Sequence, residues 1–205
     1  MAVDLVPPDR SQITAVVLAG GLGRRMSADG QGTNKAMIPF QQQPLIAHVI
    51  ERITPQVGSV IINADPLDLQ WQTFGLPVLA DLIADRPGPL AGIHAALAVA
   101  TTPWVLSVPC DTPRLPTDLV EQMIKTQVAR RADRVSVRCG TQSHPVIALL
   151  HRSLAEELQR YLSQGGRRIE TWLRQGSWAQ TTFDDESAFV NLNTMDELRQ
   201  QEGGR

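Results

Sequence analysis

The feature that most constrains this chain is an apolar run, Ala15–Ala19, that ends in three glycines within four residues. Because the run is continuously apolar, it predicts a buried strand of a parallel sheet. Glycines at the end of a strand let the backbone turn sharply and bring N–H groups close to a bulky anion. Arg24, Arg25 and Lys35 follow and add positive charge. We therefore expect a loop that binds the phosphates of a nucleotide.

Two common nucleotide-binding motifs are excluded at this loop. No Gly-Lys-Ser/Thr sequence ends it, so it is not a P-loop. Met26 stands where the G-x-G-x-x-G dinucleotide fingerprint needs its last small residue. Considered alone, the loop also fits an ordinary tight connection between a strand and a helix. The rest of the sequence is needed to distinguish this interpretation from a phosphate-binding loop.

Composition excludes several classes of protein. The chain of 205 residues has a formal net charge of −2, which is not the footprint of a nucleic-acid binder or of a basic membrane-binding face. No window approaches about 18 uninterrupted apolar residues, and residues 1–12 lack the apolar core of a signal peptide. The two cysteines, Cys110 and Cys139, have no zinc-site spacing and imply no disulfide framework. We expect a cytoplasmic protein.

Strands alternate with helices over the first 115 residues. We expect strands at 59–64, 77–81 and 104–108 after the first one, with helices at 44–53 and 90–100 and a short helical piece at 67–74. This alternation predicts βα units on a mostly parallel sheet. Residues 1–12 are expected to form a tail and residues 13–116 a nucleotide-binding half.

The chain changes character after residue 116. We expect helices at 118–131, 152–163 and 168–174, strands at 135–138 and 144–150, and two short strands at Phe183 and at 189–193. Thr194–Glu197 has the spacing of a capping box that starts a last helix. No linker separates residues 117–205 from the first half, so we expect a single domain whose second half is smaller and partly antiparallel.

Polar residues fall at the carboxyl ends of four predicted strands: Gly20, Asn63, Asp81 and Asp111. Ligands of open α/β sheets bind beyond these ends, so the four residues are expected to face one crevice. Asn63 and Asp81 suit the edge of a base or a ribose, or else local turns. His144 is the one histidine of interest for the site.

Asp111 is the strongest single candidate. It follows a strand directly and lies between Pro109 and Pro113, which make the turn rigid. A carboxylate beside phosphate oxygens is repulsive unless a divalent cation lies between them, and Mg²⁺ is usually held by one or two carboxylates plus substrate phosphates. Asp111 is therefore interpreted as a magnesium ligand; an isolated Asp-Thr-Pro is equally typical of a simple turn.

Several motifs resemble one known family. Leu18–Gly21, Arg24–Met26 and Lys35 resemble the L-A-G-G-x-x-x-R-M…K signature of sugar-nucleotide and cofactor nucleotidyltransferases. Further motifs narrow the resemblance to the molybdenum cofactor guanylyltransferase (MobA) family: Asp81 with Gly88–Gly92, Val108–Pro116, His144-Pro145, Gly165–Arg168 and Phe189–Thr194. The likeness covers about residues 13 to 200.

The resemblance implies a three-layer α/β, Rossmann-like fold that transfers GMP from GTP to molybdopterin and releases pyrophosphate, with Mg²⁺. The implied GTP-binding residues are Leu18, Ala19, Gly20, Gly21, Lys35, Asn63, Asp81 and Asp111. The implied catalytic residues are Lys35, Asp111 and Arg25, with Asp111 as the metal ligand, and Asn191 and Asn193 face the pterin. The implied protein partners are enzymes that make molybdenum cofactor or receive it.

The sequence departs from the family pattern in two places. The segment from Met26 to Lys35 is longer than usual, and Asn34 replaces the aspartate before the lysine. Gln42 replaces the glycine before Pro-Leu. Three other functions remain open: a related transferase that uses CTP or a sugar phosphate, a nucleotide-binding regulator without turnover, and an adaptor that carries molybdopterin.

Overall fold

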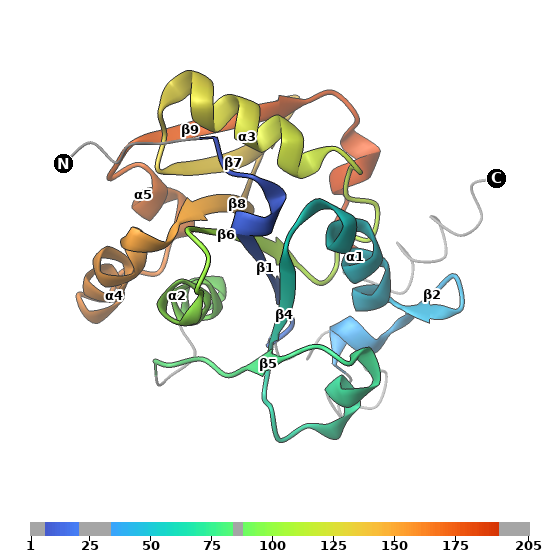
Figure 1. Cartoon of the computed structure of the whole chain (residues 1–205). Coiled ribbons are helices and arrows are strands. Elements are labelled where there is room, and N and C mark those ends of the chain that lie inside the picture. The colour runs from blue at the N-terminus through green and yellow to red at the C-terminus, as the bar shows by residue number, and fades with distance from the viewer. Residues whose placement is uncertain (1–6, 21–33, 84–87, 193–205) are drawn as a thin grey trace.

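The computed structural model describes residues 7–20, 34–83 and 88–192 (Figure 1). The strands are β1 (Ile13–Leu18), β2 (Pro39–Phe40), β3 (Gln43–Pro44), β4 (Ser59–Asn63), β5 (Val78–Leu79), β6 (Trp104–Pro109), β7 (Arg134–Cys139), β8 (Gln142–His151) and β9 (Trp178–Phe183). The α-helices are α1 (Leu45–Ile53), α2 (Pro89–Val99), α3 (Leu119–Arg130), α4 (Ala155–Ser163) and α5 (Ile169–Leu173). Short 3₁₀ helices lie at Arg10–Gln12, Lys35–Met37, Thr54–Gln56, Leu69–Phe74, Arg152–Leu154 and Glu186–Phe189.

Within these residues the central sheet has seven strands in the order β5-β4-β1-β6-β8-β7-β9, and β2 and β3 form a separate antiparallel pair. Strand β8 runs antiparallel to both β6 and β7, whereas every other neighbouring pair of the central sheet is parallel. The mostly parallel sheet with an antiparallel portion in the second half, predicted from the sequence, is confirmed.

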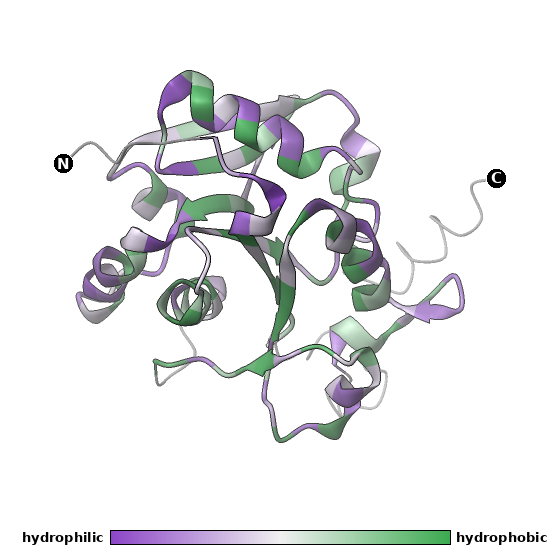
Figure 2. Cartoon of the chain, in the orientation of Figure 1, coloured by the Kyte–Doolittle hydropathy of each residue, from purple (hydrophilic) through white to green (hydrophobic). Residues whose placement is uncertain are grey.

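Helices cover both faces of the sheet, which makes the fold a three-layer α/β/α sandwich (Figure 1). Strand β1 is buried along most of its length, and its side chains alternate between two cores. Ala15 and Val17 pack in the core shared with α1 and α3, and Val16 packs in the core shared with α2, α4 and α5. Hydrophobic residues accordingly fill the central strands, and hydrophilic residues gather on the outer surfaces of the helices (Figure 2). No helix in the described part of the chain is long and apolar enough to cross a membrane.

One strand prediction is wrong. Phe183 does end a strand, β9, but residues 189–192 form no strand, and Glu186–Phe189 is a 3₁₀ helix. The reason is tertiary: Leu192 donates its backbone N–H to the carbonyl of Asp111 at 3.0 Å, and its side chain packs with the β2–β3 hairpin. The segment therefore follows a loop instead of a sheet edge. Asn193 and the expected helix from Thr194 lie outside the described residues.

The β2–β3 hairpin was not predicted. Its turn places Gln41 and Gln42 at φ 48° and 69°, in the left-handed region that favours glycine or asparagine. Gln42 therefore adopts a backbone conformation that favours glycine, although the glycine is missing.

A buried arginine ties the second half of the fold together. The Arg134 side chain is 1% exposed and donates to both carboxylate oxygens of Glu157, at 2.9 and 3.1 Å, and to Asp133 at 2.8 Å. Its guanidinium also lies 5.1 Å from the centre of the Trp172 ring. Burial opposes the charge, but the hydrogen bonds to the two carboxylates outweigh it and raise the pKa of Arg134. Gly176 leaves room for this group, since a Cβ there would lie 2.4 Å from the guanidinium.

We predict that Arg134→Ala lowers the free energy of unfolding by about 3 kcal/mol or more. The substitution leaves the partly buried carboxylates of Asp133 and Glu157 without their partner and opens a cavity. Chemical denaturation measures this change. Lys125→Ala is the control, since its exposed pair with Glu121 contributes less than about 1 kcal/mol. Equal effects of the two substitutions would contradict the prediction.

Candidate functional site

The register of the parallel strands brings their carboxyl ends into one row. Leu18 of β1 pairs with Asn63 of β4 on one side and with Pro109 of β6 on the other. Asn63 in turn pairs with Leu79 of β5. The residues that follow these strands therefore emerge along a single edge, which is where open α/β sheets bind ligands.

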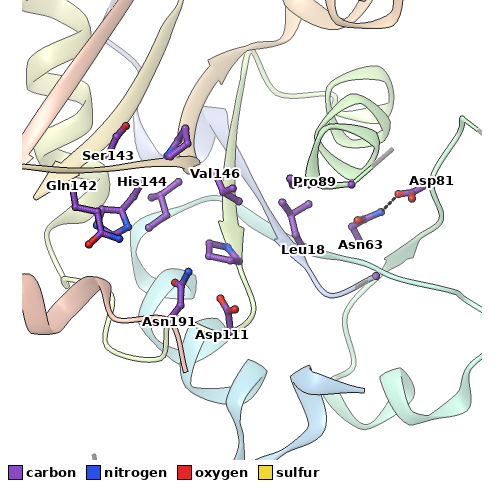
Figure 3. A pocket seen from close by; sticks show the side chains of 15 residues that line it. Leu18, Asn63, Asp81, Pro89, Asp111, Gln142, Ser143, His144, Val146 and Asn191 are labelled. Carbon is purple, nitrogen blue, oxygen red and sulfur yellow. Dashed lines mark hydrogen bonds between the residues drawn. The ribbon is translucent and has the colours of Figure 1, made fainter. Parts of the chain in front are cut away.

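A cavity of about 520 Å³ lies along this edge (Figure 3). This volume is within the range of small-molecule sites. Seven residues that the sequence singled out line it: Leu18, Gly20, Asn63, Asp81, Asp111, His144 and Asn191. In Figure 3, Asp81 and Asn63 lie at one end of the cavity, Gln142 and His144 lie at the other, and Asp111 lies between them.

Asn63 is fixed by both donors of its side-chain amide. Its Nδ2 donates to the Asp81 carboxylate at 2.9 Å and to the carbonyl of Leu79 at 3.1 Å. Its Oδ1 lies against Gly92 of α2, where a Cβ would come within 2.0 Å of that oxygen. Gly92 is therefore needed so that helix α2 can approach the strand ends with Asn63 in this position.

Lys35 and Asp111 form an ion pair at the carboxyl end of β6. Their side chains are only 17% and 15% exposed, so the pair is shielded from most solvent. Asn34 caps the 3₁₀ helix that carries Lys35, and its side chain accepts from the N–H of Ala36 at 3.1 Å. The asparagine that replaces the family's aspartate thus positions the lysine by capping.

The second oxygen of Asp111 is suited to a cation. The lysine contacts Oδ2, whereas Oδ1 is buried and has no hydrogen-bond partner among the described residues. A buried carboxylate oxygen without a partner is costly, and a divalent cation satisfies it. The described part of the chain holds no group of three or more His, Cys, Asp or Glu side chains placed to bind a metal. This donor set fits Mg²⁺, which needs only one or two protein carboxylates when it also binds substrate phosphates.

The neighbouring titratable groups are suited to structural roles. Burial raises the pKa of the Cys110 thiol to about 12, with the Asp111 charge adding to the effect, so Cys110 is a neutral buried side chain and not a nucleophile. Burial lowers the pKa of His144, which is therefore a neutral ring near pH 7. Cys110 and Cys139 are both free and buried.

Strand β8 supplies most of the lining that sequence reasoning missed. Because β8 is antiparallel, its amino end lies beside the carboxyl end of β6, and residues 142–147 all line the cavity. Ser136 of β7 pairs with Ala148 of β8, but the next residue, Val137, pairs with His144. This irregularity turns consecutive side chains of β8 toward the site. Ser107 stabilises the distortion by donating to the carbonyl of Val146 at 2.6 Å. The His144-Pro145 pair was the only sequence signal for this wall.

The other residues predicted for the site do not line the cavity or lie outside the described residues. Ala19 does not line the cavity, and its N–H donates to the carbonyl of Asn63 at 2.9 Å. Lys35 reaches the site through Asp111. Gly21 and Arg25, like Asn193, lie outside the described residues, so their roles stay predictions. Gly88 and Pro89 at the start of α2 also line the cavity and were not singled out individually.

Comparisons with known proteins agree on one family. A family model described as "MobA-like NTP transferase domain" matches residues 15–180. The chain is 43% identical over 198 residues to the molybdenum cofactor guanylyltransferase of Cupriavidus necator, covering 94% of this chain and 98% of that protein. It is 40% identical to the protein of the same name from Shewanella putrefaciens, covering 92% and 95%. The crystal structure of molybdopterin-guanine dinucleotide biosynthesis protein A from Archaeoglobus fulgidus superposes with a TM-score of 0.73 at 26% identity, covering 92% and 96%.

We predict that Gly92→Ala weakens binding of GTP, the ligand expected from the sequence. The added methyl group must displace the Asn63 side chain and break its contact with Asp81. Isothermal titration calorimetry with a non-hydrolysable GTP analogue measures the affinity.

Ala98→Gly is the matched control on the exposed side of α2. Alanine has a higher helix propensity than glycine, so Gly92→Ala favours the helix and Ala98→Gly disfavours it, by roughly 1 kcal/mol in each case. A loss of affinity in the control but not in Gly92→Ala would refute the role given to Asn63.

Proposed function

Because the chain belongs to the MobA-like NTP transferase family, and is thus a nucleotidyltransferase, we propose that it transfers GMP from GTP to molybdopterin and releases pyrophosphate. The relatives named molybdenum cofactor guanylyltransferase support the choice of nucleotide and acceptor. We further propose that residues 13–116 bind the nucleotide and that residues 117–205 bind the acceptor within one continuous domain.

One observation carries this proposal: the Lys35–Asp111 pair lies at the edge where the strand ends meet, and Asp111 Oδ1 has no hydrogen-bond partner among the described residues. A lysine and a cation-binding carboxylate side by side are what a triphosphate needs. The ammonium group neutralises phosphate oxygens directly, and the carboxylate holds a cation that does the same. Neither feature is needed for an adaptor that binds only molybdopterin.

The transfer requires positioning and charge neutralisation more than covalent help from the protein. An oxygen of the acceptor's phosphate attacks the α-phosphorus of GTP, the bond from that phosphorus to the bridging oxygen breaks, and pyrophosphate leaves. In this proposal Asn63 and Asp81 hold the guanosine end, and Lys35 stabilises the negative charge that develops on the phosphates. In the same proposal the triphosphate lies beside Leu18 and Gly20, above the sheet edge.

Asp111 Oδ1 is the atom proposed to bind Mg²⁺. When bound, the ion supplies Lewis-acid neutralisation of phosphate oxygens. Asp111 is held for this role by its ion pair with Lys35 and by the N–H of Leu192, which donates to its backbone carbonyl at 3.0 Å.

The acceptor is proposed to lie on the side of Asn191. Thr112 directly follows Asp111 in the chain. Its buried hydroxyl donates to Asn191 Oδ1 at 2.8 Å and so orients the Asn191 side chain. Asn191 is thereby connected to the loop that carries the proposed metal ligand.

The decisive test is an assay of the purified protein with each of the four ribonucleoside triphosphates, Mg²⁺ and molybdopterin. The proposal expects pyrophosphate release with GTP and with molybdopterin present. Release with CTP instead would identify a cytidylyltransferase. GTP binding without any release would identify a regulator.

We predict that Lys35→Ala slows GMP transfer by roughly 100-fold or more, as for the loss of an electrostatic clamp. The initial rate of pyrophosphate release measures this effect. Lys125→Ala removes an exposed lysine on α3 and serves as the control. If Lys35→Ala retains nearly full turnover, Lys35 does not hold the phosphates.

A second prediction concerns Asp111→Asn. This substitution keeps the shape of the side chain but removes the charge that binds the cation, so turnover is lost at every accessible Mg²⁺ concentration. A titration of the rate with Mg²⁺ measures the effect. Wild-type turnover at ordinary Mg²⁺ concentrations would remove Asp111 from the metal site.

A further inference from the structure

A second, smaller cavity of about 310 Å³ borders the large one on the side of β8. Gln142, His144 and Asn191 line both cavities, whereas Glu186 and Phe189 line only the smaller one. A ligand that fills the smaller cavity therefore lies against whatever occupies the larger one. Its volume is at the low end for small-molecule sites and suits a fused-ring system.

The walls combine flat rings with amide groups. The His144 ring lies 5.3 Å from the buried Phe189 ring at an interplanar angle of 33°. Gln142 and Asn191 bring side-chain amides, each able both to donate and to accept hydrogen bonds. Rings beside a few polar groups are typical of sites for heteroaromatic ligands.

Glu186 adds a carboxylate that has no hydrogen bond or ion pair within the described part of the chain. Its backbone position is set by Asp185, which caps the 3₁₀ helix by accepting from the N–H of Ser187 at 3.0 Å. Gly140, in the β7–β8 turn, has φ +53° and leaves room for the carboxylate, because a Cβ there would lie 2.8 Å from Glu186 Oε1. The exposed Glu186 side chain thus lies beside this turn at the edge of the cavity.

We propose that the smaller cavity binds the pterin ring of the acceptor and that the Glu186 carboxylate accepts hydrogen bonds from the ring's N3–H and 2-amino group. A carboxylate accepts two parallel N–H bonds with matching geometry, and such charge-assisted bonds are stronger than neutral ones. This inference rests on the proposed function, since it assigns a place to the acceptor of that reaction.

Guanine presents the same pair of N–H groups as the pterin. The position of each carboxylate in the site must therefore determine which ring it binds. Asp81 offers a carboxylate at the opposite end of the large cavity, and Asp111 lies between the two ends (Figure 3). The α-phosphorus keeps the guanosine on one of its oxygens while the acceptor's oxygen attacks in line with the departing pyrophosphate, so the two rings cannot occupy the same end of the cavity. With guanosine beside Asp81, the pterin is left with the cavity beside β8.

Steady-state kinetics of Glu186→Gln test the proposal first. The expected result is a KM for molybdopterin raised roughly 10-fold, from loss of a charge-assisted hydrogen bond, with the KM for GTP unchanged. Glu121→Gln, an exposed acid on α3, is the control. An unchanged KM for molybdopterin, or a raised KM for GTP instead, would overturn the proposal. Glu186→Asp keeps the charge on a shorter side chain, and its KM for molybdopterin is expected to lie between those of the wild-type protein and Glu186→Gln.

Direct binding gives a second test that needs no turnover. The probes are 6-hydroxymethylpterin and the matching lumazine, in which oxygen replaces the 2-amino group, and their own fluorescence reports binding. The wild-type protein is expected to prefer the pterin roughly 10-fold, and Glu186→Gln to lose that preference. Equal binding of both probes by the wild-type protein would overturn the proposal. Pterin preference without pyrophosphate release would instead refute the proposed reaction while leaving the ring site standing.

Discussion

The site depends on one constraint, the register of the parallel strands. Leu79, Asn63, Leu18 and Pro109 are paired in succession across the sheet, so four strands end in one row. The buried side chains of β1 fix that register, since a slip by one residue would exchange its two cores. Gly20, Asn63, Asp81 and Asp111 then lie at the same edge of the sheet, and Lys35 joins them through its ion pair with Asp111. The positions of the cavity-lining residues are thus set by hydrophobic packing beneath them.

The second half of the chain uses a different arrangement to reach the same place. In the central sheet of the described residues β8 alone reverses direction, and this brings its amino end and its irregular pairing beside the end of β6. The buried Arg134 anchors β7 to α4 and α5 behind that strand. The two halves therefore offer two kinds of wall, turns with charged groups on one side and a distorted strand with rings and amides on the other.

Much of the fold and part of the site could be predicted from the sequence. Continuous apolar runs identified β1, β4 and β6, and the polar residues directly after them line the cavity, because parallel strands place their ends together whatever the distant contacts are. A strand at 144–150 in a partly antiparallel half was predicted, but the wall that β8 makes was not, since its place beside β6 and its shifted pairing depend on tertiary partners. Glu186 was missed for the same reason: it is adjacent to Gly140 only in the folded chain. The segment 189–193 misled the strand prediction because Phe189 and Leu192, its buried side chains, pack in two different clusters around a loop.

A crystal structure with Mg²⁺ and a non-hydrolysable GTP analogue tests the central claim most directly. The account predicts a metal ion about 2.1 Å from Asp111 Oδ1. It also predicts that the same ion contacts the phosphates and that the base lies beside Asn63 and Asp81. A triphosphate bound away from the row of strand ends, or a metal ion that does not touch Asp111, would contradict it.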